Sequence, residues 1–213
     1  MTDTAKQNGK PLTPAGVKTT LAGGAAIYLL LKAGSGYGWM LRPPGAVAEE
    51  EFLKKCLRCG RCAHVCPYDA VKMGKLTDGQ AIGTPVIVPR EMPCYLCPSL
   101  PCVKACPSAA LDPELKDPFK TRMGTAVITE REECLSIKGL RCEVCYRTCP
   151  VIDKAITVES YLNVKTGRHT IFEPVVHKKD CTGCGICEKA CVLARSAIVV
   201  QPLQPPTENW YEG

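Results

Sequence analysis

The residues most able to do chemistry in this 213-residue chain are its sixteen cysteines. They fall into four sets of four with none left over. Successive sets start roughly 40 residues apart, a repeat that indicates one structural unit used several times. Set 1 is Cys56, Cys59, Cys62 and Cys66; set 2 is Cys94, Cys97, Cys102 and Cys106; set 3 is Cys134, Cys142, Cys145 and Cys149; and set 4 is Cys181, Cys184, Cys187 and Cys191.

The spacing within the sets indicates iron–sulfur chemistry. Sets 1 and 4 read C-x2-C-x2-C-x3-C, the pattern of a loop that wraps one [4Fe–4S] cluster with three thiolates and gives its fourth thiolate to a second cluster. Set 2 reads C-x2-C-x4-C-x3-C and set 3 reads C-x7-C-x2-C-x3-C. A proline follows sets 1 to 3, whereas Val192 follows set 4. The sequence therefore predicts four [4Fe–4S] clusters held by all sixteen cysteines.

Zinc and disulfide bonds are the two alternatives to iron and sulfide. Structural zinc sites pair Cys-x2-Cys knuckles across a long spacer, and three cysteines within seven residues leave the middle one badly placed for that geometry. Cysteines three residues apart in a tight loop are also badly placed to bridge each other. A zinc-bound or disulfide-bonded interaction module without a redox role is thus the disfavoured reading; such a protein would be colourless, whereas clusters absorb near 400 nm.

Sharing of the fourth cysteine requires that the sets be paired. A ferredoxin repeated with an insertion would nest the two middle sets between the two outer ones. The expected ligand groups are then Cys56, Cys59, Cys62 with Cys191; Cys181, Cys184, Cys187 with Cys66; Cys94, Cys97, Cys102 with Cys149; and Cys134, Cys142, Cys145 with Cys106.

Between the sets the sequence predicts short strands and short helices. β-branched runs bounded by Gly, Pro or charge predict strands, and a short helix is expected after each Cys-Pro. The fold class is therefore α+β, a duplicated bacterial-ferredoxin-like fold with short hairpins. The expected domain is 41–203, with an outer pair of motifs (50–75 and 175–203) around an inner pair (85–160) and a tail, 204–213. The predicted strands are Thr84–Pro89, Thr125–Glu130, Ala155–Ser160, His169–Val176 and Ala197–Pro202.

The remaining composition argues against several functions. The net charge is +6, and the lysines and arginines are scattered among acidic residues. They do not form the basic stripe typical of nucleic-acid binding, and the positive charge is more compatible with an acidic protein partner. No nucleotide loop or catalytic constellation is present, so we expect an electron carrier and no enzyme. We interpret His64 and the tyrosines near the motifs as packing residues. Arg58, Arg61, Arg141 and Arg147 are read as solvated charges near the clusters.

Four longer stretches carry a resemblance to a known family. They are LRPPGA (41–46) before set 1, RMGTAV (122–127), GLRCEVCYRTCPVIDKAIT (139–157) and CTGCGICEKACVL (181–193). Over residues 41–203 the chain resembles the NapG/MauM group of ferredoxin-type proteins. The resemblance implies transfer of electrons from a NapH-like membrane quinol-oxidising protein to a periplasmic cytochrome or molybdenum reductase, most directly nitrate reductase. The alternative is the electron-transfer subunit of a DMSO-reductase or formate-dehydrogenase type of complex.

The N-terminal segment, residues 1–40, departs from that group. Its members usually carry a twin-arginine export signal, whereas this segment has lysines and no arginine pair. The apolar run from Leu21 to Leu31 has eleven residues, the length of a signal core and short for a spanning helix. We favour an uncleaved anchor that holds the domain at the periplasmic face of the inner membrane. A degenerate, later-cleaved export signal comes next, and a soluble cytoplasmic protein last.

Overall fold

The computed structural model describes residues 40–164, 167 and 170–203. All of them belong to one of the two units into which the chain divides, Gly38–Gly213. The predictions for residues 1–39, for the tail 204–213 and for His169 fall outside the described residues. Within the described part of the chain, no helix combines the length and the apolar character needed to cross a membrane.

Four short helices each begin one residue before the third cysteine of their set and end before the fourth, and a longer helix precedes set 1. The expectation of a helix after each Cys-Pro is therefore wrong. Proline has no backbone N–H and disfavours the helical conformation in the residue before it, so in sets 1 to 3 the helix does not continue through the fourth cysteine. The helices are α2 (Glu49–Lys55), α3 (Arg61–His64), α4 (Pro101–Lys104), α5 (Val144–Arg147) and α6 (Ile186–Ala190), with 3₁₀ turns η1 (Leu76–Ala81) and η2 (Pro118–Lys120).

The strands form three antiparallel pairs, which confirms the predicted α+β class. Each predicted run overlaps a strand, while β1 was missed because it is only three residues long with Lys72 at its centre. The pairs are β1 (Val71–Met73) with β2 (Pro85–Ile87), β3 (Gly124–Ile128) with β6 (Ile198–Pro202), and β4 (Ile156–Leu162) with β5 (Thr170–Val176).

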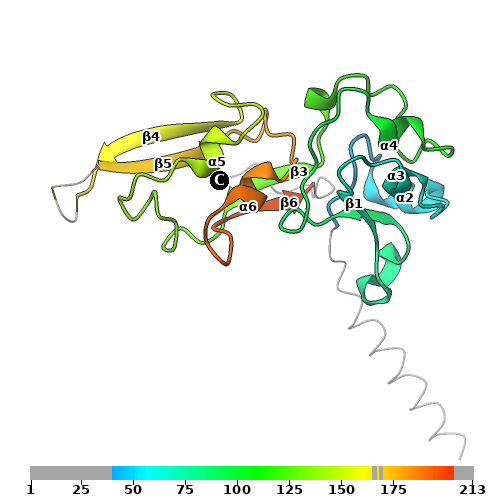
Figure 1. The fold of residues 1–213 in the computed structure, drawn as a ribbon, viewed down its shortest axis with the longest axis horizontal. Helices are drawn as coiled ribbons and strands as arrows, with labels where there is room; N and C mark the ends of the chain where they lie inside the picture. Colours follow the sequence, from blue (N-terminus) through cyan, green and yellow to red (C-terminus); the bar gives the residue numbers. More distant parts are fainter. Residues whose placement is uncertain (1–39, 165–166, 168–169, 204–213) are drawn as a thin grey trace, which may run out of the picture. The chain divides into compact units, whose positions relative to one another are not determined.

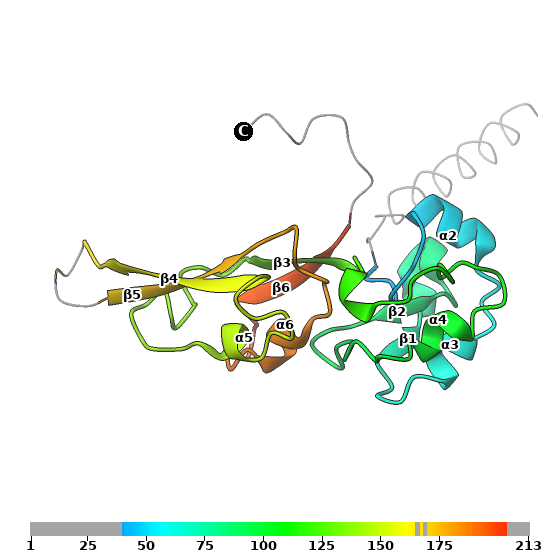
Figure 2. The same ribbon diagram turned by 90° about the horizontal axis from the view of Figure 1, so that it is seen from above.

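The elements gather by chain order. In Figures 1 and 2, α3 lies beside α4 near β1, and α5 lies beside α6 near β3 and β6, and these helix pairs are in contact. One buried cluster centres on Phe52, Leu111 and the thiols of sets 1 and 2. The second centres on Ile156, Ile198 and the thiols of set 4. Neighbouring sets therefore share a core, and the small number of large apolar residues is supplemented by cysteine.

The LRPPGA stretch stabilises the core around Phe52 and Leu111. The guanidinium of Arg42 is buried and bonds Glu49 at the start of α2, with N–O distances of 2.8 and 2.5 Å. Its third nitrogen donates to Thr84 Oγ1 at 2.7 Å, and the group lies 4.6 Å from the centre of the Phe52 ring. A buried arginine needs this many acceptors because an unpaired charge there would be costly. Arg42 thus fixes α2 against β2.

A backbone hydrogen bond joins residues 40–120 to residues 121–203. The N–H of Cys94 donates to the carbonyl oxygen of Cys184 at 2.9 Å. Leu96 is buried in the same core as the set 4 thiols. Set 2 and set 4 therefore meet directly.

Arg90 replaces proline at the end of set 4. Val192 stands where the other sets have proline, and the guanidinium of Arg90 caps the free carbonyls at this helix end, which a proline turn would otherwise terminate. The nitrogen–oxygen distance to the Cys191 carbonyl is 2.9 Å. In all, Arg90 donates to the carbonyls of Glu188, Lys189, Cys191, Leu193 and Ala194.

We predict that Arg90→Ala destabilises the protein by about 2 kcal/mol, because hydrogen bonds from a charged donor are lost and carbonyls at a helix end are left unpaired. Thermal unfolding followed by far-ultraviolet circular dichroism should show a midpoint about 4–8 °C lower. Arg122→Ala is the matched control, since Arg122 donates to one exposed carbonyl, that of Lys178. Equal midpoints for the two variants would contradict the capping role.

Gly183 gives a second test of how the sets are positioned. Its φ is +72°, and a Cβ there would lie 2.3 Å from the backbone nitrogen of Gly124 in β3. Gly60 has nearly the same φ, +71°, but a Cβ there would meet nothing within 4 Å. We expect Gly60→Ala to cost about 1–2 kcal/mol from the left-handed conformation alone, and Gly183→Ala to cost clearly more. Thermal midpoints of the two variants, measured side by side, check this difference; equal losses would show that the contact with β3 is unimportant.

Candidate metal centres

Each of four cavities is lined by four cysteines. Three come from one set and the fourth from another, and we number each site by the set that supplies three. Site 1 has Cys56, Cys59, Cys62 and Cys106; site 2 has Cys94, Cys97, Cys102 and Cys66; site 3 has Cys134, Cys142, Cys145 and Cys191; and site 4 has Cys181, Cys184, Cys187 and Cys149.

The nested pairing of the sets is wrong in every one of its fourth ligands. The structure brings set 1 together with set 2, and set 3 with set 4, instead of the outer sets with each other and the inner sets with each other. The fourth cysteines that were assigned to the wrong site are Cys191, Cys66, Cys149 and Cys106. The physical reason is local packing: α3 contacts α4 and α5 contacts α6, and elements adjacent in sequence are usually adjacent in space.

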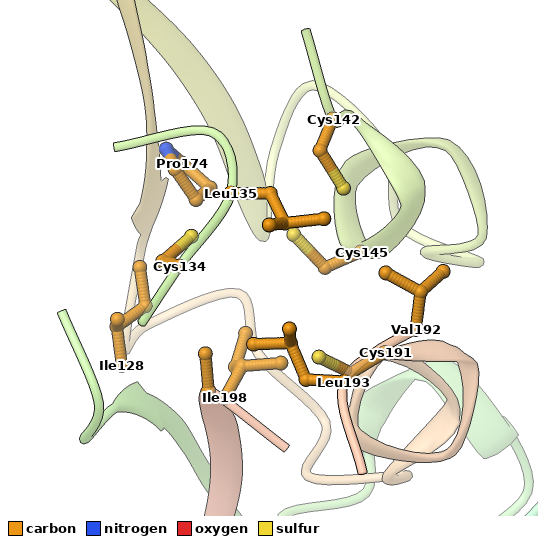
Figure 3. A pocket seen from close by; sticks show the side chains of 11 residues that line it. Ile128, Cys134, Leu135, Cys142, Cys145, Pro174, Cys191, Val192, Leu193 and Ile198 are labelled. Atoms are coloured by element: carbon orange, nitrogen blue, oxygen red, sulfur yellow. The ribbon is translucent and has the colours of Figure 1, made fainter. Parts of the chain in front are cut away.

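Figure 3 shows site 3, in which Cys134 from the long loop, Cys142 and Cys145 around α5, and Cys191 after α6 face a common space. The remaining walls are aliphatic, from β3, β5, β6 and the turn after α6. The seven residues between the first two cysteines of set 3, in place of the usual two, therefore lengthen the loop without removing its first thiol from the cavity wall.

Six of the sixteen thiols are buried, and several lie close enough to affect each other. Burial, followed by the neighbouring Cys66 and Cys62, raises the pKa of Cys102 to about 12. Burial, with smaller contributions from Cys56, Cys106 and Cys59, raises the pKa of Cys62 to about 11. Four thiolates in one such cavity require a cation to offset their repulsion, and metal binding therefore releases protons.

The turn after each fourth cysteine directs backbone N–H groups at sulfur. The N–H of Ala70 donates to Cys66 Sγ at 3.3 Å. For Cys106, burial raises the thiol pKa, but N–H groups that include those of Leu111 and Ser108 lower it below the ordinary value overall. Positive φ angles make these turns possible at Asp69, Ala109 and Asp153. Hydrogen bonds to sulfur are one of the factors that set cluster potentials.

Three loops share the same strained backbone position. The second residue after the first cysteine has a positive φ in set 1 (Arg58, 54°), set 2 (Leu96, 50°) and set 4 (Gly183, 72°). L residues seldom adopt this conformation, so its repetition indicates that it is what turns the cysteines of one loop toward one cavity. The sequence showed a glycine only in set 4 and gave no signal for the other two.

The donor sets fit [4Fe–4S] clusters. All sixteen cysteines are described, and all are free thiols. Among the described residues, no three His, Cys, Asp or Glu side chains converge closely enough for a single metal ion. The thiols of each site therefore surround a space rather than a point, with four sulfur ligands available at every site, as a cubane requires.

The other candidate residues lie around these sites. His64 is exposed and lines a surface groove beside site 1. Tyr68 and Tyr95 both line site 2, with ring centres 4.5 Å apart, which agrees with a packing role. Arg141 and Arg147 both pair with Glu143. Sequence reasoning missed Arg42 and Arg90; only the LRPPGA stretch and the absence of proline at Val192 hinted at them.

Thiols of different sites interact in a chain. Besides burial, Cys184 of site 4 helps raise the pKa of Cys94 in site 2 to about 12. Burial is also the main cause of the raised pKa of Cys187, to which Cys145 of site 3 contributes. Together with the Cys62–Cys102 interaction, these contacts connect the sites in the order 1, 2, 4, 3.

Comparison with known proteins finds ferredoxin-type relatives of this chain. A family model described as a 4Fe-4S dicluster domain matches residues 55–110, which hold sets 1 and 2. The ferredoxin-type protein NapG of Escherichia coli is 48% identical over 201 residues, covering 92% of this chain and 87% of that protein. MauM of Methylorubrum extorquens, named a methylamine utilization ferredoxin-type protein, is 45% identical over 184 residues, covering 86% of this chain and 82% of that protein.

No solved structure matches the chain. Identity at this level over most of both chains, together with cavities that gather sulfur ligands in fours, leads to one assignment: the chain belongs to the NapG/MauM family of ferredoxin-type proteins.

Proposed function

We propose that the protein is an electron carrier with four [4Fe–4S] clusters, one at each site, held by the sixteen cysteines. The observation that carries the proposal is the gathering of four thiols at each of four cavities. Bound clusters supply one-electron, outer-sphere redox chemistry. The chain's own residues hold the sulfur ligands, exclude water with aliphatic walls, and donate backbone N–H groups to the fourth cysteines.

Electrons follow one linear route in this proposal, through sites 1, 2, 4 and 3. Sites 1 and 2 adjoin because their sets exchange fourth cysteines, and sites 3 and 4 adjoin for the same reason. The step between sites 2 and 4 is supported by the hydrogen bond from the Cys94 N–H to the Cys184 carbonyl oxygen. Sites 1 and 3 are then the two ends, and each has one neighbouring site.

The physiological role we propose follows the family. A NapH-like quinol-oxidising membrane protein gives electrons to one end, and a periplasmic cytochrome or molybdenum reductase, of the nitrate-reducing kind, takes them from the other. The NapG relative at 48% identity supports this assignment. The N-terminal segment, residues 1–40, serves as the anchor or export signal that keeps the domain at the periplasmic face.

A second candidate rests on the MauM relative. Its identity of 45% is almost as high as that of NapG, and its name connects it with methylamine utilization. An electron carrier in that process would use the same four sites and differ in the redox partner at one end. The quinol-linked nitrate role remains the first candidate because the NapG match covers more of the chain.

Iron analysis of cysteine variants tests both the cluster number and the pairing. The wild-type protein, purified without oxygen, should hold about 16 iron atoms per chain, four for each cluster. Cys59→Ala and Cys106→Ala both remove ligands of site 1, so each variant and the double variant should all lose the same cluster. The matched double variant, Cys106→Ala with Cys142→Ala, affects sites 1 and 3 and should lose two clusters.

The opposite result identifies the nested pairing. If Cys106→Ala adds no further loss to Cys142→Ala but does add to Cys59→Ala, then Cys106 belongs with set 3. A colourless protein with bound zinc would overturn the cluster assignment itself. Low-temperature electron paramagnetic resonance of the reduced variants provides a second readout of how many clusters remain.

The membrane side is tested by protease treatment of spheroplasts, with a cytoplasmic protein as control. We expect the chain to be degraded while the control stays intact, because the proposed role places the domain outside the cytoplasm. Protection until the cells are lysed would place it in the cytoplasm and would exclude the quinol-to-periplasm role. The blot should use an antibody against residues of the 41–203 domain.

A further inference from the structure

A groove of about 630 Å³ opens on the surface next to site 1. It is formed by the turn before α3, by α3 itself, and by the end of α4 with the Cys-Pro that follows. The residues that define its character are Cys59, Arg61, His64, Val65, Lys104 and Cys106. It is open to solvent, unlike the enclosed cavity of site 1 beneath it.

Two thiols separate this groove from site 1. Cys59 and Cys106 line both the inner cavity and the outer groove. Cys59 is the single exposed cysteine of the sixteen, all of which are described. A molecule seated in the groove would therefore contact ligands of site 1 directly, without intervening side chains. No other site brings a cysteine this close to solvent.

The charge of the groove has one sign. Its ionisable lining residues other than the two thiols are Arg61, His64 and Lys104, and no carboxylate contributes. All three are exposed, and within the described part of the chain none has an acidic partner. A surface cation without a partner is free to meet a carboxylate of another protein.

The other end of the route is different. Beside site 3, the arginines at 141 and 147 share one carboxylate, that of Glu143, so half of their charge is balanced internally. The side chains that protrude there are apolar: Leu140 is 57% exposed and Val192 is 62% exposed. The two ends therefore present surfaces of different chemistry, and the cations in the groove beside site 1 are the ones with no carboxylate among them.

We propose that the groove beside site 1 is the docking surface for a soluble redox protein whose own redox centre is surrounded by carboxylates. The inference rests on the proposed electron-carrier function. Lys104 and Arg61 pair with carboxylates of the partner, while Val65 and Cys59 form the apolar centre of the contact. One electron crosses at Cys59 or Cys106: site 1 loses one electron as the partner's one-electron centre gains it, or the reverse. No bond is made or broken.

Charge reversal in the groove tests the proposal with an acidic flavodoxin as the probe. Its hydroquinone form donates one electron to the oxidised protein, and stopped-flow absorbance follows the reaction at low ionic strength. In Arg61→Glu/Lys104→Glu the second-order rate constant should fall at least about 10-fold, as expected when steering charges are reversed. The rate with a basic mitochondrial cytochrome c, which takes an electron from the reduced protein, should not fall.

Lys120→Glu/Lys178→Glu is the matched control, because it changes the net charge equally at exposed positions away from the groove. Its rate with flavodoxin should stay within about twofold of wild type at the same ionic strength. Equal slowing of both double variants, or no slowing of either, would overturn the docking surface. Lys104→Glu alone, with a smaller effect in the same direction, replaces the double variant if that variant loses clusters.

A second readout does not depend on electron transfer. Carbodiimide should cross-link Lys104 to a carboxylate of the flavodoxin, and mass spectrometry should locate the bond; links only to lysines elsewhere would overturn the proposal. Iron content and paramagnetic resonance of every variant separate the two failures. A wild-type protein without clusters would refute the electron-carrier function, whereas fully loaded variants with unchanged rates would refute the groove alone.

Discussion

Every candidate metal centre depends on one thiol that crosses from the neighbouring set. Three cysteines of a loop can turn toward one cavity, but the fourth is separated from them by a short helix and reaches the cavity of the adjacent loop instead. Cys66 and Cys106 make this exchange between sets 1 and 2, and Cys149 and Cys191 make it between sets 3 and 4. Each loop is thus completed only by its partner, so the two loops of a pair must pack together, and this requirement explains why α3 contacts α4 and α5 contacts α6.

The spacing of cysteines was enough to predict which residues line the sites, because the first three ligands are local. It was not enough to predict the fourth, since that choice depends on which loops pack together. The nested arrangement and the sequential one use the same sixteen cysteines and the same spacing. Strands were predictable where β-branched runs are long, as in β4, but the three-residue β1 carries too little pattern. The helices were predicted one segment too late, after each Cys-Pro, whereas each one contains the third cysteine of its set and ends before the fourth.

Departures from the common motif are compensated by contacts from distant residues. Set 4 lacks the proline that follows the fourth cysteine in the other sets. Arg90, which lies 101 residues before Cys191, instead donates hydrogen bonds to the carbonyls at the end of α6. Lys189 returns a bond to the Glu91 carbonyl at 2.9 Å. These reciprocal contacts hold the end of α6, and therefore Cys191, while also tying residues 40–120 to residues 121–203. The position where set 4 has Val192 in place of proline is therefore stabilised by contacts that also connect the two pairs of sites.

The distribution of burial and charge along the route follows from what each site must do. Sites 2 and 4 meet inside the shared core, where Cys94 and Cys184 are buried and are joined by a backbone hydrogen bond. Interior positions of this kind exclude water and need no surface charge. Site 1 must exchange electrons with another molecule, which requires that at least one ligand come near the surface, and Cys59 does so. Exposure of a ligand to solvent is a liability for a cluster, so it is useful only where a partner docks. The unpaired cations around Cys59 offer such a partner a binding surface of defined charge, whereas the two arginines at the other end of the route are partly neutralised by Glu143.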